Sequence, residues 1–127
     1  MFMYKELIKT AYRENDRFYD EIDSVEKLQL WLCEHGFSSI KATDEMVFRL
    51  ANVRHMIKKY INASASGRDV NTEAFNKFAD KYRIDGFLQI GRTEALFFKD
   101  PIEFEEPYQT IFQSFKDFQN RKYEKGL

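Results

Sequence analysis

The chain has 127 residues, enough for one domain that buries roughly two-thirds of its unfolded surface and folds without crosslinks. Its aromatic content is 17%, with 13 Phe and 7 Tyr against only 5 Gly and 2 Pro, which excludes a disordered or low-complexity chain. Twenty basic and 21 acidic residues give a net charge of −1, whereas proteins that bind polyanions usually carry a basic excess. We therefore expect residues 1–127 to form a single ordered domain, with nucleic acid unlikely as the main ligand.

Cysteine usage and hydropathy indicate the compartment. Cys33 is the only cysteine, so the chain can form neither an intrachain disulfide nor a cysteine-based zinc cluster. The first residues, MFMYKELIK, reach a charge at Lys5 and lack the apolar run of a signal peptide. Later segments fall short of the ~20 apolar residues that a membrane span needs. These features predict a cytoplasmic protein without a membrane segment.

The first quarter of the chain has no long periodic run. From Phe2 to Tyr12 the apolar residues have helix-like spacing, which predicts a short helix or a strand-like lead-in. The segment from Arg13 to Asp23 is rich in acids, and we predict a connection that its aromatic residues, Phe18 and Tyr19, pin to the domain. The charges of this connection are expected to form a solvated face.

The next segment has helix signals at both ends. Asp23 or Ser24 is the predicted N-cap, with Glu26 in capping-box position relative to Asp23. One apolar stripe follows, made of Val25, Leu28, Trp31 and Leu32. Gly36 is predicted to end the helix in a left-handed conformation, with Phe37 making the apolar contact of a Schellman motif.

The longest periodic stretch runs from Thr43 to Asn62. Its apolar residues recur at intervals of three and four, as on one face of a helix. They are Met46, Val47, Leu50, Val53, Ile57, Tyr60 and Ile61. Phe48, Ala51 and Met56 widen this surface, which predicts a second neighbour on the flank. Thr43 is the expected N-cap, and acids in the first turn and lysines in the last complement the helix dipole. We expect the rest of the chain to pack around this central helix.

The second half of the chain changes pattern once. After a loop around Gly67, the spacing predicts a helix from Asn71 to Arg83. Two short apolar runs, from Phe87 to Ile90 and from Glu94 to Phe98, then predict a β-hairpin. Pro107 suits the first turn of a last helix. The predicted fold is mainly α with a small β-hairpin (α+β), in which four main helices form a compact domain around the central one.

Recognisable catalytic signatures are missing. The sequence has no glycine-rich phosphate loop, no HExxH and no nucleophile elbow. His55 lies within a turn of Arg54 and Lys59, where a lowered pKa could suit proton transfer, but an exposed helix histidine is the commoner outcome. Neighbouring acids such as Asp44 and Glu45 point about 100° apart on a helix, so they do not form a ligand pair. We predict no catalytic residue, no metal site and no cofactor.

Basic residues on the central helix are the candidates for an anion contact. They are Arg49, Arg54, Lys58 and Lys59. Arg54 lies at the apolar boundary beside Val53 and Ile57, where its guanidinium could pair with a buried carboxylate or with a bound anion. A structural salt bridge is the commoner of these outcomes. Trp31 is expected to line the same region, although a place in the core is the commoner outcome for such a residue.

Several short motifs follow one another in a characteristic order. They are Glu6-Leu7-Ile8-Lys9-Thr10, Leu28-x-x-Trp31-Leu32-x-x-x-Gly36, Val53-Arg54 and Phe75-Asn76, with a strand pair after Gly86. In this order they resemble the ABATE domain, the helical N-terminal part of bacterial proteins that usually end in a CGNR zinc finger and are described as stress-induced transcription regulators. Lys9 and Glu6 depart from that family's usual Asn and Asp.

The resemblance implies a regulator in which the zinc finger touches DNA. The finger would supply several cysteines and a basic segment, but this sequence has only Cys33 and stops at Leu127. We therefore expect the sensing or partner-binding half of such a protein, acting alone or with another chain.

The last helix carries more aromatic surface than one packing face needs. Its aromatic residues and the one just before it are Phe104, Tyr108, Phe112, Phe115 and Phe118. We expect a standalone regulatory module that binds a small ligand or a protein partner. Its anchor would be Arg54, with Trp31 and Arg49 beside it. Phe115 and Phe118 would serve a partner, most simply in a homodimer.

Two alternatives remain open. One is a fully packed monomer that buries the aromatic rings of the last helix. The other is weak, non-specific nucleic-acid binding through the basic face of the central helix and the C-terminal tail NRKYEKGL.

Overall fold

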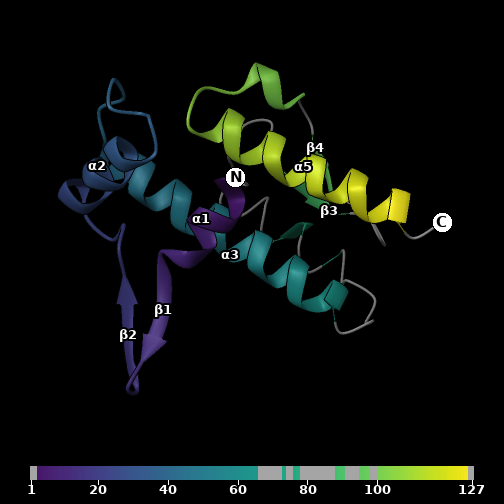
Figure 1. Cartoon of the computed structure of the whole chain (residues 1–127), viewed down its shortest axis with the longest axis horizontal. Helices are drawn as coiled ribbons and strands as arrows, with labels where there is room; N and C mark the ends of the chain where they lie inside the picture. The colour runs from purple at the N-terminus through teal and green to yellow at the C-terminus, as the bar shows by residue number, and fades with distance from the viewer. Residues whose placement is uncertain are drawn as a thin grey trace.

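The computed structural model describes residues 3–65, 73, 76–77, 88–90, 95–97 and 100–125 (Figure 1). The helices with described bounds are α1 (Met3–Lys9), α2 (Val25–Glu34), α3 (Asp44–Ala65), α5 (Tyr108–Lys125) and a short 3-10 helix, η1 (Pro101–Glu103). Two antiparallel pairs join β1 (Ala11–Glu14) to β2 (Arg17–Asp20) and β3 (Leu88–Ile90) to β4 (Ala95–Phe97). The predicted mainly helical fold with a small β-hairpin is confirmed, and β1–β2 adds a second hairpin.

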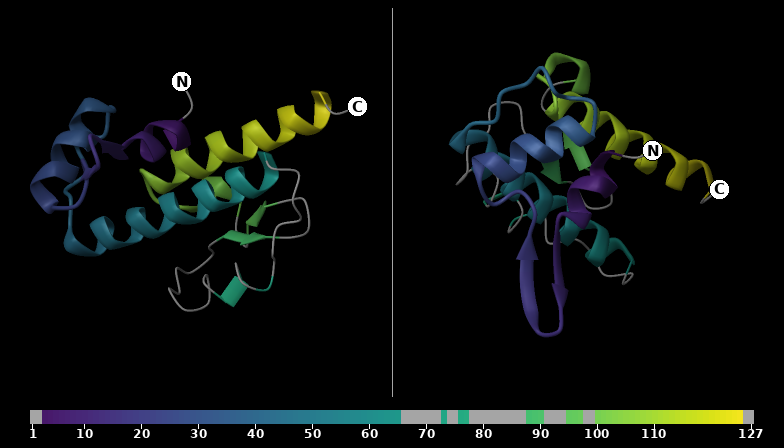
Figure 2. Two further views of the ribbon diagram at one scale, coloured as in Figure 1. Left: turned by 90° about the horizontal axis from the view of Figure 1, so that it is seen from below. Right: turned by 60° about the vertical axis from the view of Figure 1, so that its left-hand side comes forward.

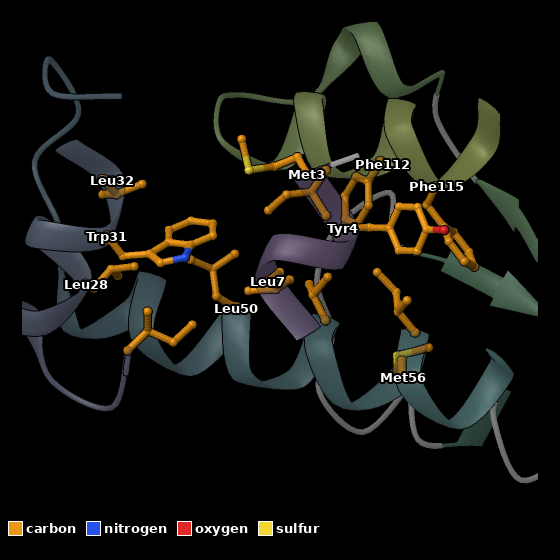
Figure 3. Close-up of a cluster of buried hydrophobic side chains, with 14 of the residues drawn as sticks. Met3, Tyr4, Leu7, Leu28, Trp31, Leu32, Leu50, Met56, Phe112 and Phe115 are labelled. Carbon is orange, nitrogen blue, oxygen red and sulfur yellow. The ribbon is translucent and has the colours of Figure 1, made fainter. Parts of the chain in front are cut away.

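The short helix α1 lies at the centre of the helical core, between α3 and α5 (Figure 2). Its Tyr4 and Leu7 side chains are buried. The Tyr4 backbone N–H donates to Ser114 Oγ on α5 at 3.0 Å, and the Tyr4 ring lies edge-on to Phe115 with centroids 5.5 Å apart. Figure 3 shows these rings gathered between the three helices. The segment predicted as a short helix or a lead-in is therefore a helix, and it contributes to the core.

Helix α3 begins where the sequence predicts. The Thr43 hydroxyl accepts a hydrogen bond from the Met46 N–H at 3.2 Å, which confirms Thr43 as the N-cap. The buried apolar residues of α3 keep the predicted spacing; they are Leu50, Val53, Met56, Ile57 and Tyr60. Phe48 was expected to have a covering neighbour but is exposed, because the helices that pack on α3 lie over the Leu50 face.

Helix α2 has the predicted caps. Ser24 is the N-cap, and its hydroxyl accepts from the Lys27 N–H at 3.2 Å. At the other end Gly36 adopts a φ of +85°, and the Phe37 N–H donates to the Leu32 carbonyl at 2.8 Å, as in a Schellman motif. The other cap candidate, Asp23, lies outside the helix.

The β1–β2 hairpin replaces the predicted connection between Arg13 and Asp23. Asn15 and Asp16 form its two-residue loop, with φ values of 52° and 65°, the left-handed conformations that such tight hairpins require. Figures 1 and 2 show the hairpin projecting away from the helices. At its open end, the Glu21 N–H donates to the Thr10 carbonyl at 2.8 Å. The aromatic residues of this segment are therefore carried on a strand pair and not on an irregular connection.

The C-terminal half agrees with the predictions where it is described. The β3–β4 hairpin pairs Leu88 with Phe97, inside the predicted runs. Helix α5 begins directly after Pro107 and extends to Lys125. Of the helix predicted from Asn71 to Arg83, only Glu73, Asn76 and Lys77 are described, and these three are helical. The rest of that prediction lies outside the described residues.

Candidate functional site

Arg54, the predicted anchor, lies on the buried side of α3 and meets the open end of the β1–β2 hairpin. Its two terminal nitrogens donate to the two carboxylate oxygens of Asp20, at 2.9 Å to Oδ1 and 2.7 Å to Oδ2. The nitrogen nearer Oδ1 also donates to the Thr10 hydroxyl at 2.8 Å. This paired geometry is the strong form of the arginine–carboxylate interaction. Arg54 therefore forms a structural salt bridge, the commoner of the two outcomes that its sequence context allowed.

The Asp20 carboxylate is held in its charged form. Burial by itself would raise the pKa of Asp20, but hydrogen bonds from Arg54 and the Ile22 N–H, with the positive charges of Arg54 and Lys27, outweigh burial and hold the pKa below its usual value. The bond from the Ile22 N–H is 3.0 Å long. Since the partners are 34 positions apart in the sequence, the pair fixes β2 onto α3.

A pocket of about 380 Å³ lies between this hairpin and α2. Its lining combines aromatic, aliphatic and charged side chains: Tyr12, Phe18, Tyr19, Asp20, Glu21, Asp23, Lys27, Leu30, Trp31 and Glu34. Tyr12 and Tyr19 are opposite each other in the hairpin, and their rings stack at 5.3 Å. Phe18 and Leu30 are 64% and 65% exposed. The pocket is therefore open at the surface, with large apolar side chains around it.

Trp31 forms the deep side of this pocket. It is only 4% exposed, and Figure 3 shows its indole between α2 and Leu50 of α3. The His35 ring lies against it, with centroids 4.5 Å apart, and His35 Nδ1 is 2.7 Å from the Trp31 carbonyl oxygen. His35 Nε2 is 3.7 Å from Glu6. Trp31 therefore packs in the core and also lines the pocket, whereas its role in binding a ligand stays a prediction.

The pocket carries more negative than positive charge. Four of its lining residues are acids and one is a lysine. Two of the acids have partners, Asp20 with Arg54 and Asp23 with Lys27, whose Nζ is 3.0 Å from the Asp23 carboxylate. The other two, Glu21 and Glu34, are exposed and form no ion pair within the part of the chain that the structure describes.

The other basic candidates lie away from this pocket. Arg49 pairs with Glu45 on its own helix at 2.7 Å. Its positive charge also acts on Tyr108, although burial dominates there and raises the pKa of Tyr108 to about 12. Lys58 and Lys59 are exposed, and they add to burial in lowering the pKa of His55. Arg49 is therefore not brought together with Trp31.

Phe115 and Phe118, predicted for a partner, lie on the inner side of α5. Phe115 is 0% exposed, and its ring meets the rings of Tyr4 and Tyr60 edge-on. Phe118 is half-buried and packs against Tyr4 at 5.5 Å. In this structure both rings therefore serve the core, as the packed-monomer alternative requires, and Phe115 presents no surface to a partner.

Of the four exposed large aromatic residues in the described part of the chain, one is Phe48 on α3, and the other three are on the hairpin, where the sequence predicted only a connection. Tyr12, Phe18 and Tyr19 were not candidate site residues, and neither was Leu30. Two signals point to them. The dipeptide Asn15-Asp16 suits a two-residue hairpin loop, and the flanking segments carry the aromatic residues that strands favour. Leu30 gives only a weak signal, since it breaks the apolar stripe of α2.

Within the described residues, no three His, Cys, Asp or Glu side chains lie close enough to share a metal ion. None of the described helices combines the length and the apolar character of a membrane span. No protein-family model, no curated protein and no solved structure matches the chain. The ABATE resemblance therefore stays a prediction.

Proposed function

We propose that this protein is a regulatory binding module that takes a small ligand or a protein partner in the pocket between the β1–β2 hairpin and α2. The pocket itself carries the proposal. Its volume of about 380 Å³ is in the range of sites for small molecules or for single anchoring side chains. Its lining places large apolar side chains next to charged ones, two of which, Asp20 and Asp23, are held by ion pairs, and apolar surface with placed polar groups is typical of such sites.

Exposure of the lining supports a binding role. A folded monomer gains little from holding Phe18 and Leu30 largely in water, and clustered apolar side chains on a surface commonly mark binding sites. These residues come from different elements, so a ligand in the pocket would contact both the hairpin and the helix.

Hydrogen bonds join the hairpin beneath the pocket to α3. Asp20 is fixed by Arg54, and Thr10 holds the same guanidinium from the start of the hairpin. A site whose polar groups are already in place loses less entropy on binding. Arg54 thus acts in this proposal as a support for the site, one residue removed from the ligand.

The regulatory part of the proposal rests on the ABATE resemblance alone. Nucleic-acid binding has less support, because the α3 arginines are already paired. Arg54 binds Asp20 and Arg49 binds Glu45. A phosphate would have to compete with these carboxylates for the guanidinium groups, and the chain carries a net charge of −1.

The single tryptophan offers a direct test. Trp31 lines the pocket, so its indole N–H signal in an NMR spectrum reports on binding there. We would titrate the ¹⁵N-labelled protein with a fragment library containing cationic, anionic and neutral compounds. We expect hits that shift the signals of Trp31, Tyr12 and Tyr19 together.

Leu30→Ser supplies the decisive variant, and Ile102→Ser is its control. Both residues are exposed aliphatic side chains, at 65% and 70%, but only Leu30 lines the pocket. Hits should be lost in Leu30→Ser and kept in Ile102→Ser, while both variants stay folded. The proposal would be contradicted by hits that shift signals outside the pocket, or by hits that bind Leu30→Ser as well as they bind the wild type.

A further inference from the structure

The charge of the pocket indicates the chemistry of its ligand. After Asp20 and Asp23 are paired, Glu21 and Glu34 remain as exposed carboxylates in the lining, without a counter-ion among the described residues. Lys27, the one cationic side chain among the described lining residues, is already paired with Asp23. An anion would therefore meet net repulsion in this pocket, and a cation would meet net attraction.

The aromatic residues point to the same chemistry. The faces of Tyr, Trp and Phe rings carry negative charge density, which attracts ammonium and guanidinium groups placed over them. Tyr12 and Tyr19, each more than a third exposed, and the mostly buried Trp31 supply such rings in the same lining as Glu21 and Glu34. Carboxylates combined with aromatic rings make a site that suits an organic cation better than a neutral apolar group.

The size of the apolar rim distinguishes a polypeptide from a small amine. Phe18 and Leu30 are each about two-thirds exposed at the edge of the pocket, at 64% and 65%. A small amine inside the pocket would leave most of that surface in water. A basic side chain that is followed by an apolar one on the same backbone would cover both.

Building on the binding role proposed above, we propose that the pocket docks a lysine- or arginine-bearing segment of a partner protein. The cationic group lies against Tyr12, Tyr19 and Trp31, close to Glu21 and Glu34. A neighbouring apolar side chain of the partner covers Phe18 and Leu30. The partner surface is thus basic and amphipathic, complementary in charge to the hairpin end of this molecule.

Matched synthetic peptides test this inference. The probes are capped octapeptides in which leucine alternates with lysine, with glutamine or with glutamate, and lysine amide serves as the small cation. Binding is read from Trp31 fluorescence and from its indole N–H signal. We expect the lysine peptide to bind at least about tenfold more tightly than the glutamine peptide. The glutamate peptide should not bind, and lysine amide should bind far more weakly than the lysine peptide.

Charge variants locate the effect. Glu21→Gln and Glu34→Gln should each weaken binding of the lysine peptide about threefold, and the double variant about tenfold. Glu26→Gln is the matched control, since Glu26 is an exposed acid on α2 outside the pocket lining. It should leave the affinity unchanged. Circular dichroism would verify that all variants are folded.

The outcomes separate this inference from the proposal on which it rests. Equal binding of the lysine and glutamine peptides would overturn the cationic ligand but keep a binding pocket. Binding of lysine amide as tight as that of the lysine peptide would overturn the protein partner in favour of a small organic cation. If neither the peptides nor the fragment library shifts Trp31, both the inference and the proposed function fail.

Discussion

Two groups of aromatic residues in the described part of the molecule play different parts. Around α1, the rings of Tyr4, Tyr60 and Phe115 meet edge-on and are buried. On the hairpin, Tyr12 and Tyr19 stack on each other, and Phe18 beside them is mostly exposed. The residue types are the same, so composition does not separate the groups. The difference lies in whether a third element covers the rings.

The surface available for binding lies on the β1–β2 hairpin and not on the last helix, where the sequence analysis expected it. The sequence indicated surplus aromatic residues on the last helix, but α1 packs onto that helix and uses them. The hairpin rings are less covered, since Tyr12 and Tyr19 are 38% and 39% exposed and Phe18 is 64% exposed. An aromatic cluster is therefore a binding candidate only after its packing neighbours have been counted.

The largest expected effect is on the buried group. Phe115→Ala should lower the free energy of unfolding by about 3–5 kcal/mol, because it leaves a cavity where three rings meet. Phe18→Ala, the matched exposed position, should change it by less than about 0.5 kcal/mol. Urea denaturation followed by circular dichroism measures both. Similar losses of unfolding free energy at Phe115 and Phe18 would contradict the division into a buried and an exposed aromatic group.

The next effect concerns the ion pair that links the hairpin to the core. Arg54→Ala should cost about 3 kcal/mol of stability, because it leaves the Asp20 carboxylate partly buried without its partner. A double-mutant cycle with Asp20→Ala isolates the interaction. The same cycle on Arg49 and Glu45, a more exposed pair within one helix, should yield about 0.5 kcal/mol or less. Equal coupling energies would show that Arg54 and Asp20 behave as an ordinary surface pair.

Acid should weaken the same link. The pKa of Asp20 is lower in the folded protein than in the unfolded chain, so its contribution is complete above the unfolded pKa of about 4 and is lost as the pH falls through the lower folded value. Stability of the wild type should therefore decline more steeply below about pH 5 than that of Asp20→Asn. Urea midpoints of both proteins, measured from neutral to acidic pH, test this. If the midpoints of the wild type and of Asp20→Asn fall in parallel, Asp20 does not contribute to the acid sensitivity.

The smallest effect is expected within the hairpin itself. Tyr12→Ala removes the stacked cross-strand pair with Tyr19 and should cost about 1 kcal/mol or less. The loss should be local, seen as faster amide exchange in β1 and β2 without a change in the core helices. A cooperative loss throughout the molecule would instead place the hairpin within the core.

Local features of this fold could be predicted from the sequence because their causes lie within a few residues. The Thr43 and Ser24 caps, the Schellman end at Gly36 and the buried face of α3 all follow from spacing and cap chemistry. The β3–β4 hairpin followed in the same way from two short apolar runs. Arg54 also stood out in the sequence, since a guanidinium at an apolar boundary needs a partner.

Only the tertiary structure decided which partner Arg54 has and which aromatic rings remain exposed. Asp20 is 34 positions away from Arg54, and nothing in the charged segment around it distinguishes it from its acidic neighbours. Likewise, the sequence left open whether the segment of α1 is a helix or a strand-like lead-in, and only the structure shows that α1 packs between α3 and α5 as part of the core. Burial and pairing depend on which distant elements meet in space, whereas caps and periodicity depend on neighbours along the chain. For that reason the elements of this protein were largely predictable from its sequence, while the pocket was not.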